Sequence, residues 1–249
     1  MAAVSLVNIN IAKKSFPAVN QASEHIAIAD FKLTIRSNEF VCLVGPSGCG
    51  KTTLLNIIAG LDQDFDGEIL VGPSGTQPKI GYVFQNPRLL PWRTVRENVE
   101  LVLERFQNAE LIDYLLEVMQ LTQFQHAYPE RLSLGMSRRV ALIRAFAVNP
   151  DLLLMDEPFV SLDAPTARQV RESLLVLWQE RPHTVLFVTH DLREAIALAD
   201  RLVFLSAAPM GFITEIIVPI AREDRNNEQA IEAFRQQLLN DYPTIKQLL

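Results

Sequence analysis

The stretch that decides the fold is Gly45-Pro46-Ser47-Gly48-Cys49-Gly50-Lys51-Thr52, which follows an apolar run from Phe40 to Val44. Its spacing, G-x-x-x-x-G-K-T, predicts a phosphate-binding loop, because three glycines let the backbone curl until successive N–H groups converge on a polyphosphate. Lys51 is placed to reach the β- and γ-phosphates, and Thr52 to ligate Mg²⁺. Residues 53–59 continue with the apolar spacing of a helix. This order of strand, loop and helix indicates an α/β protein.

A second stretch copies half of this loop. Val71-Gly72-Pro73-Ser74-Gly75 repeats residues 44–48 letter for letter, but it continues with Thr76-Gln77-Pro78 and contains no lysine. Without the lysine it cannot hold a triphosphate in the same way. We therefore predict that residues 72–78 form a surface turn between two strands.

Length and composition limit the class of protein. The chain has 249 residues, of which 49% are hydrophobic, enough for one well-buried α/β domain with a small appended lobe. The net charge is −6 and the basic residues are scattered, which argues against a nucleic-acid partner. We expect no signal peptide and no membrane span, so a soluble protein that reaches a membrane only through a partner. The only cysteines, Cys42 and Cys49, suit a reducing compartment, and the four dispersed histidines lack metal-ligand spacing.

Apolar periodicity gives the order of elements. It predicts strands over residues 4–9, 26–35, 40–44, 68–71 and 80–83, and then a helical lobe over 94–147 with helical stretches at 95–99, 101–106, 111–121 and 140–147. A buried strand over 151–155, a helix over 166–181, a second buried strand over 184–189 and an amphipathic helix over 227–240 complete the pattern.

An acidic pair, Asp156-Glu157, follows the buried strand that ends at Met155. Asp156 can hold Mg²⁺, and Glu157 can orient and deprotonate an attacking water. Two more polar residues also follow strands. His190 ends the stretch 185–190 and can reach a γ-phosphate, while Gln85 directly follows the stretch 81–84 and can contact Mg²⁺ or water. These residues complete a predicted site for nucleotide hydrolysis.

The stretch Leu132-Ser133-Leu134-Gly135-Met136 predicts a second phosphate-binding device. Ser133 and Gly135 stand at the start of a predicted helix that runs to about residue 147, so their N–H groups and the helix dipole form an anion site. Two phosphate-binding devices and one triphosphate suggest two subunits that face each other head to tail. Each subunit would then clamp ATP between its own loop and the helix start of its partner.

With these pieces assembled, the sequence resembles an ABC-type ATPase subunit over nearly its whole length. Gly45, Pro46, Ser47, Gly48, Cys49, Gly50, Lys51, Thr52 and Thr53 match the Walker A loop of that family, and Gln85 matches its Q-loop. Residues 132–136 match the signature motif, 152–157 the Walker B strand, 161–163 the D-loop with Asp163, and His190 the switch histidine. Phe16 aligns with the aromatic residue that stacks on adenine, although on sequence alone a core position fits it equally well.

The resemblance implies a P-loop NTPase core with an N-terminal antiparallel β subdomain and an inserted helical subdomain, the ABC ATPase fold. Residues 1–249 would form one ABC ATPase domain, with the core and β subdomain over 1–85 and 149–249 and the helical subdomain over 86–148. ATP and Mg²⁺ are the implied cofactors. The implied partners are permease subunits in the membrane, a second ATPase subunit (the same chain or a related ATPase) and, indirectly, an extracytoplasmic solute-binding protein.

Within the family, the sequence is most similar to the ATPases of nitrate, sulfonate and taurine importers. The likeness rests on residues 89–95, on the Gly135-Met136 ending of the signature and on residues 206–211. It implies a motor subunit at the cytoplasmic face of the membrane, which energises uptake of a small anionic solute. We expect residues 89–99 to dock a permease helix through exposed apolar side chains such as Trp92, which could alternatively belong to the core.

One departure from the family pattern is Leu134, which stands where the signature has its first glycine. If a left-handed backbone is required there, leucine costs about 1–2 kcal/mol and weakens the ATP-bound dimer. This motivates an alternative function, a non-hydrolytic or attenuated subunit of an ATPase heterodimer, which intact Lys51, Glu157 and His190 oppose. A non-transport ABC ATPase acting on DNA or ribosomes, or a lipid-trafficking ATPase resembled faintly by residues 135–139, are further alternatives.

Overall fold

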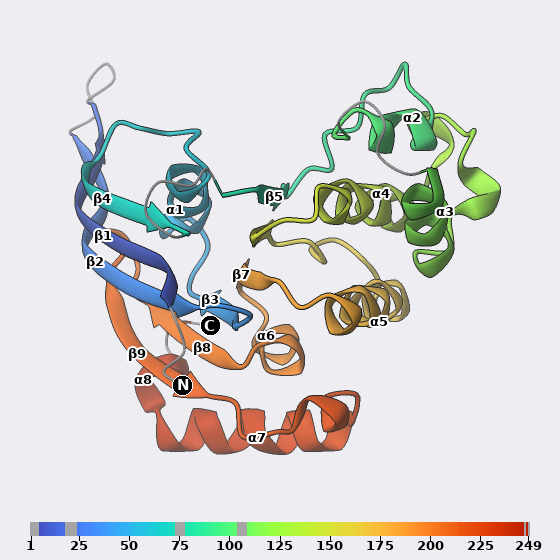
Figure 1. Cartoon of the computed structure of the whole chain (residues 1–249). Coiled ribbons are helices and arrows are strands. Elements are labelled where there is room, and N and C mark those ends of the chain that lie inside the picture. The colour runs from blue at the N-terminus through green and yellow to red at the C-terminus, as the bar shows by residue number, and fades with distance from the viewer. Residues whose placement is uncertain (1–4, 18–23, 73–77, 104–108, 247, 249) are drawn as a thin grey trace. The chain divides into compact units, whose positions relative to one another are not determined.

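The computed structural model describes residues 5–17, 24–72, 78–103, 109–246 and 248 (Figure 1). The chain divides into two compact units, Met1–Gln77 with Thr184–Leu249, and Pro78–His183. No helix within the described residues is both long enough and apolar enough to cross a membrane. The sequence-based domain boundaries at residues 85 and 149 stay a prediction.

The first unit contains a small antiparallel sheet with the strand order β2-β1-β4. Its strands are β1 (Ser5–Phe16), β2 (His25–Arg36) and β4 (Asp66–Val71). Along β2 the side chains of Phe31, Leu33 and Ile35 are buried while their neighbours are exposed, which is the alternation that predicted the strand. β1 is longer than predicted, because Lys13 and Lys14 continue its pairing with β2 despite their polarity.

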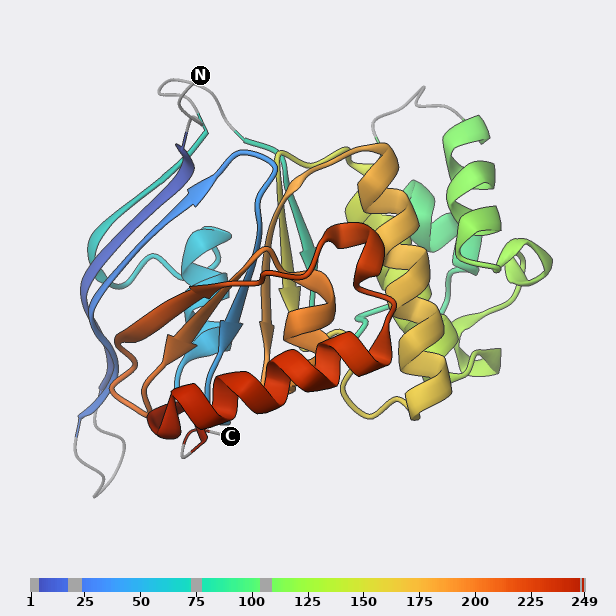
Figure 2. The ribbon, with the colours of Figure 1, turned by 90° about the horizontal axis from the view of Figure 1, so that it is seen from below.

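The same unit contains a set of mostly parallel strands in the order β7-β3-β8-β9. β3 (Phe40–Val44) lies between β7 (Thr184–Thr189) and β8 (Arg201–Leu205), parallel to both, and β9 (Phe212–Ile217) pairs antiparallel with β8. Every residue of β3 and β7 is buried, which explains their unbroken apolar sequences. The helices are α1 (Lys51–Ile58), α6 (Leu192–Leu198), α7 (Glu228–Asp241), which packs against α6 (Figure 2), and α8 (Pro243–Lys246).

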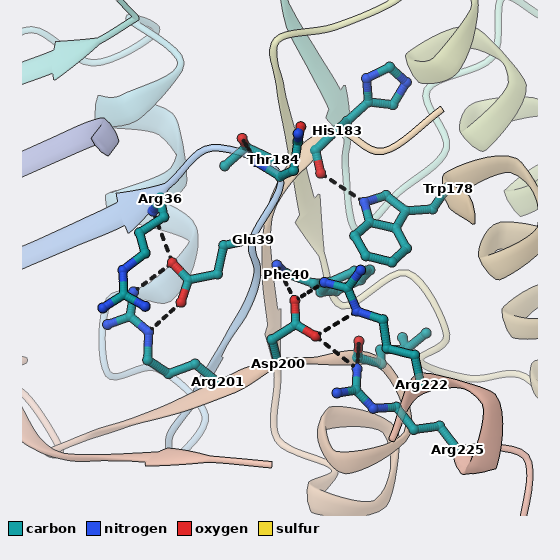
Figure 3. Close-up of polar contacts among 12 residues, drawn as sticks. Arg36, Glu39, Phe40, Trp178, His183, Thr184, Asp200, Arg201, Arg222 and Arg225 are labelled. Atoms are coloured by element: carbon teal, nitrogen blue, oxygen red, sulfur yellow. Dashed lines mark hydrogen bonds and ion pairs between the residues drawn. The ribbon is translucent and has the colours of Figure 1, made fainter. Parts of the chain in front are cut away.

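Ion pairs in the first unit gather where β3 and β8 begin (Figure 3). Asp200 accepts hydrogen bonds from the backbone N–H of Phe40 (3.0 Å), from Nε of Arg222 (2.9 Å) and from Nη1 of Arg225 (3.2 Å). Arg201 donates to Glu39 (2.8 Å). Burial acts to raise the pKa of Asp200, but the hydrogen bonds and positive charges outweigh it and hold the pKa below its usual value. This cluster joins the C-terminal segment to the strands.

The second unit contains β5 (Ile80–Val83) and β6 (Leu152–Asp156), which pair in parallel. Its helices are α2 (Val95–Glu100), α3 (Ala109–Val118), α4 (Leu134–Ala147) and α5 (Ala164–Glu180). α4 packs against β5 and against all three other helices. It crosses β5 so closely that a Cβ on Gly81 would lie 2.6 Å from the carbonyl oxygen of Ala145.

Most elements agree with the sequence-based predictions, and the differences lie at element ends and in short elements. α2 ends at Glu100, and the predicted continuation over 101–106 is a turn at 101–103, while 104–108 lie outside the described residues. The predicted turn at 72–78 also lies outside the described residues from 73 to 77. The elements α6, β8, β9 and α8 were not predicted.

Candidate functional site

The predicted phosphate loop is held in shape by its glycines. The backbone angle φ is +77° at Gly48 and +117° at Gly50, a region that favours glycine. Gly45 has a different reason to be glycine, since a Cβ there would lie 3.0 Å from the Cβ of Leu205. α1 begins directly after Gly50, and no side chain caps this helix start. A curled loop that leads into an uncapped helix start is suited to bind phosphate.

The lysine of the loop is folded back onto the loop itself. Lys51 is only 5% exposed, and its Nζ donates hydrogen bonds to the carbonyl oxygens of Gly45 (2.8 Å) and Pro46 (2.9 Å). Thr52, the next residue, is exposed. The ammonium group is therefore held against the backbone of the loop, and its contact with a triphosphate stays a prediction.

His190 lies beside this loop. In the parallel pairing of β3 with β7, Val44 is opposite Thr189, and Gly45 and His190 are the residues that follow them. The imidazole is exposed. Asp191, the next residue, caps α6 by accepting hydrogen bonds from the N–H groups of Arg193 (2.7 Å) and Glu194 (3.4 Å). The loop and His190 thus leave the sheet at the carboxyl ends of neighbouring strands, where open α/β sheets bind ligands.

Phe16 is the last residue of β1, and its side chain is 41% exposed. Of the two positions that the sequence left open for Phe16, the core is therefore the wrong one. The Nζ of Lys14 lies 4.9 Å from the centre of its ring, and the same nitrogen donates to Asp62 (2.9 Å). The ring is available for stacking on a base, and its contact with adenine stays a prediction.

In the second unit, the acidic pair and Gln85 lie at the ends of adjacent strands. β6 is buried along its whole length and ends at Asp156, which is 3% exposed. Val83 of β5 is opposite Met155 of β6, so Gln85 and Glu157 each stand two residues beyond a paired position. The structure thus brings Gln85, Asp156 and Glu157 to one edge.

Glu157 has an unusual backbone. Its φ is +44°, in the left-handed region that costs a residue with a Cβ about 1–2 kcal/mol. The carbonyl oxygen of Glu157 accepts a hydrogen bond from the N–H of Val160 (3.2 Å), which closes a turn. Strain of this kind collects at functional sites, because the surrounding structure must supply the energy to maintain it.

The predicted signature motif forms the start of α4. Ser133 is the N-cap residue, and its Oγ accepts a hydrogen bond from the N–H of Met136 (3.2 Å). Gly135 is buried, and a Cβ there would lie 2.5 Å from Cγ2 of Thr166 at the start of α5. The glycine therefore permits a close approach of the two helix starts.

Leu134 is the first residue of α4 and is not among the described residues with a positive φ. The condition for strain, a left-handed backbone at Leu134, is therefore not met, because an ordinary helical backbone suits any L side chain. The side chain is 43% exposed, so only its bulk remains as a difference from glycine. Its effect on a dimer stays a prediction.

Asp163 is the N-cap residue of α5. Its Oδ1 accepts a hydrogen bond from the N–H of Thr166 (3.0 Å) and its Oδ2 accepts one from the hydroxyl of Thr166 (2.8 Å). These bonds hold the pKa of the Asp163 carboxyl below its usual value. Ser161, two residues earlier, has a φ of +65°. The predicted D-loop is thus a tight turn fixed to α5.

The predicted docking segment presents Trp92 to solvent. Its side chain is 68% exposed, so the alternative of a core position is wrong, and its docking role stays a prediction. Trp92 stands in a turn closed by a hydrogen bond from the N–H of Arg93 to the carbonyl of Leu90 (3.1 Å). The fully buried Asn98 holds this turn, because its Oδ1 accepts from the N–H of Leu90 (2.8 Å) and its Nδ2 donates to the carbonyls of Leu90 (3.2 Å), Arg93 (3.0 Å) and Thr94 (2.9 Å).

Sequence reasoning missed Asn98 and three arginines of α4 that donate to backbone carbonyls of this unit. Arg138 contacts the segment after β6, Arg139 contacts the end of α3, and Arg144 donates to the carbonyls of Pro87 (2.7 Å) and Arg88 (3.0 Å), just after Gln85. The only signal was an arginine within the otherwise apolar stretch 140–147.

Comparisons with known proteins agree with these features. Residues 28–160 match the family described as ABC transporter. The chain is 39% identical to the nitrate import ATP-binding protein NrtD of Synechococcus elongatus, over 88% of this chain and 83% of that protein. It is 38% identical to the aliphatic sulfonates import ATP-binding protein SsuB of Bacillus subtilis (97% and 96%) and 41% identical to SsuB of Bacillus cereus (95% of each).

Among solved structures, the dimeric structure of MJ0796, a bacterial ABC transporter cassette, superposes with a TM-score of 0.74 at 30% identity. The match covers 86% of this chain and all of that one, and the same values hold for a post-hydrolysis state of that cassette bound to ADP and Pi. By family match, by full-length relatives and by fold, this chain belongs to the ABC transporter family and has the fold of its ATP-binding cassettes.

Proposed function

We propose that the chain is the ATP-hydrolysing motor subunit of an ABC importer. The observation that carries this proposal is its similarity to proteins named as import ATP-binding subunits, which extends over nearly all of both chains, as in the 95% coverage of SsuB from Bacillus cereus. The ordered site residues support the same function. A chain that kept only the fold would not need the lysine, the acidic pair and the histidine together.

ATP binds to the phosphate loop in this proposal, with Lys51 and the N–H groups of the α1 start around its phosphates and Phe16 against the adenine. Asp156, Thr52 and Gln85 carry oxygen atoms of the kind that Mg²⁺ prefers, and they are the proposed ligands of the ion. When bound, Mg²⁺ neutralises charge on the phosphates. Glu157 orients and deprotonates the attacking water, and His190 contacts the γ-phosphate.

Two such subunits act together. The start of α4, with Ser133 and Gly135, contacts the ATP held by the partner, and Asp163 lies at the same interface. The dimeric state named for the MJ0796 cassette supports this arrangement. The partner is a second copy of the chain or a related ATPase.

The dimer sits peripherally at the cytoplasmic face of the cell membrane, bound to permease subunits through residues 89–99. The solute is a small anion of the nitrate, sulfonate or taurine type, delivered to the permease by an extracytoplasmic binding protein. The names of the relatives support this class of solute. Transport assays in vesicles that contain the co-purified permease, with nitrate and alkanesulfonates as competing solutes, test it.

Hydrolysis by the purified chain tests the motor function. Glu157→Gln keeps the shape of the side chain but removes its basic carboxylate, so we expect ATP turnover to fall by about a hundredfold or more while ATP still binds. Lys51→Ala should instead lose ATP binding, because the triphosphate loses its main cation. Turnover at the wild-type rate in Glu157→Gln would refute the assignment of the general base.

The second candidate is an attenuated subunit of a heterodimer, which the exposed Leu134 at the signature position favours. Sedimentation of the Glu157→Gln protein with ATP separates the two. Self-association supports the homodimer, and association only with a related ATPase supports the heterodimer.

A further inference from the structure

Arg138 connects α4 to the segment that carries Glu157. It stands one helical turn after Leu134, and its side chain is only 4% exposed. Its Nη1 donates to the carbonyl oxygen of Glu157 (3.3 Å) and its Nη2 to that of Val160 (3.2 Å). Its Nε has no partner among the described residues, so both hydrogen bonds of this side chain go to one turn.

That turn needs an external support. Glu157 has the left-handed φ of +44°, and Ser161, just past the other end of the turn, has a φ of +65°. A backbone of this kind persists only where surrounding groups fix it. Arg138 supplies such a group, because it holds the carbonyl of the strained residue itself and that of the residue that closes the turn.

The charge of Arg138 ties it to the same place. Burial lowers the pKa of its guanidinium, and the carboxylates of Glu157 and Asp156 act in the opposite direction. Arginine keeps its proton at neutral pH, so the buried cation depends on these acids and carbonyls for its solvation. Arg138 therefore supports the backbone of the acidic segment, and the oxygen atoms of that segment in turn stabilise the charge of Arg138.

We propose that Arg138 is a positioning residue that ties the start of α4 to the backbone of Glu157, and so makes hydrolysis of one ATP depend on the contact of α4 with the other. The inference rests on the proposed function, in which Glu157 acts on the ATP of its own subunit and the start of α4 contacts the ATP of the partner. One helical turn separates the two contacts within a single chain.

The neighbouring arginine provides a matched control. Arg139 lies on the same helix, its pKa is also lowered by burial, and its Nη1 donates to a backbone carbonyl (3.1 Å), but that carbonyl belongs to Met119 after α3. Arg138→Met and Arg139→Met each replace a guanidinium by an unbranched apolar chain. Both variants therefore lose one cation from α4, buried at Arg138 and half-buried at Arg139, and only the first loses its contact with Glu157.

The experiment measures kcat, the KM for ATP, the Hill coefficient and the melting temperature of both variants. For Arg138→Met we expect kcat to fall by about tenfold, because a displaced general base is costly, with KM within about twofold and a Hill coefficient that moves toward one. When Arg138→Met is added to the Glu157→Gln protein, which should turn over little ATP, the affinity for ATP should not change. Arg139→Met should lose similar thermal stability but keep the kcat of the wild type.

Equal kcat in the two variants would overturn the proposal. If Arg138→Met does not fold, Arg138→Lys decides, because lysine keeps the charge but lacks the fork that spans both carbonyls. A several-fold loss of kcat with unchanged ATP affinity supports the proposal, and wild-type kcat rejects it. An inactive Glu157→Gln with a fully active Arg138→Met rejects this inference alone, whereas an active Glu157→Gln rejects the proposed function as well.

Discussion

Some positions in this protein are packed so closely that one additional methyl group would not fit. Gly135 is the clearest case, since its missing side chain lets the start of α4 meet Thr166 of α5. The signature motif thus contains a glycine that packing requires, whatever it also does for a nucleotide. Whether packing requires glycine at position 135 can be measured in the absence of ATP.

For Gly135→Ala we expect the free energy of unfolding to fall by about 1–3 kcal/mol, because the new methyl group would overlap Cγ2 of a stiff, β-branched side chain. Thr166→Ser removes that methyl group and keeps the hydroxyl that bonds to Asp163. The double variant should therefore recover much of the loss in urea unfolding. If the double variant instead loses the sum of the unfolding free energies that the two single variants lose, the overlap with Thr166 is not the cause.

The sequence predicted which residues belong to the candidate site better than it predicted their backbone conformations. The spacing of the loop identified Lys51, and two of its three glycines, Gly48 and Gly50, have left-handed angles that let the backbone curl. It did not reveal that Glu157 is left-handed and Leu134 is not, because φ at a residue with a Cβ depends on the surrounding turn. Phe16 and Trp92 show the same limit for burial, since an aromatic side chain fits the core and the surface equally well in a sequence.

At the scale of elements, α2 and the turn before it form one preorganised piece. Thr94 caps α2 in a capping box with Glu97, and Asn98 holds the backbone of the turn from inside. The exposed Trp92 is therefore presented on a rigid support. A rigid aromatic side chain loses little conformational entropy when a partner binds.

Trp92→Ala should abolish the stimulation of ATP hydrolysis by the permease and leave basal hydrolysis and melting temperature unchanged, because a side chain that is 68% exposed contributes little to the folded state. Leu61→Ala is a suitable control, since that side chain is 62% exposed and lies after α1, outside residues 89–99. The measurement is ATPase activity with and without permease in vesicles. Unfolding of the isolated Trp92→Ala protein would contradict the docking role.

Elements with a strong apolar pattern were predictable, and short ones were not. β3, β6 and β7 are unbroken apolar runs that are buried along their whole length. β9 contains only half-buried and exposed residues, so it lacks the alternation of buried and exposed side chains that predicts a strand. It is defined by its pairing with β8, which a local pattern does not contain.

At the scale of the whole molecule, the C-terminal segment is attached to the strands through Asp200 and its two arginines. The pKa of Asp200 is lowered in the folded state, so its contribution to stability is present above the ordinary value of about 3.9 and is lost as the pH falls below it. Acid should therefore loosen this attachment only below about pH 4. Arg225, which is 5% exposed, would then lie buried without its counter-ion.

Asp200→Asn should lower the free energy of unfolding at pH 7 by roughly 1–3 kcal/mol, because it leaves a buried arginine without a charged partner. The loss of stability as the pH falls below about 4 should be smaller than in the wild type, since the titrating group is gone. Asp241→Asn, at an exposed position on α7, serves as the control. Identical pH profiles for wild type and Asp200→Asn would contradict this assignment.

The folded-back Lys51 has a consequence for the thermodynamics of nucleotide binding. Its ammonium group has three N–H donors, and two hydrogen bonds already join it to the carbonyl oxygens of Gly45 and Pro46. Where a phosphate oxygen displaces one of these carbonyls, the enthalpy released is the difference between two charge-assisted hydrogen bonds rather than the full strength of one. Part of the bonding capacity of the Lys51 ammonium group therefore stabilises the shape of the loop before ATP binds.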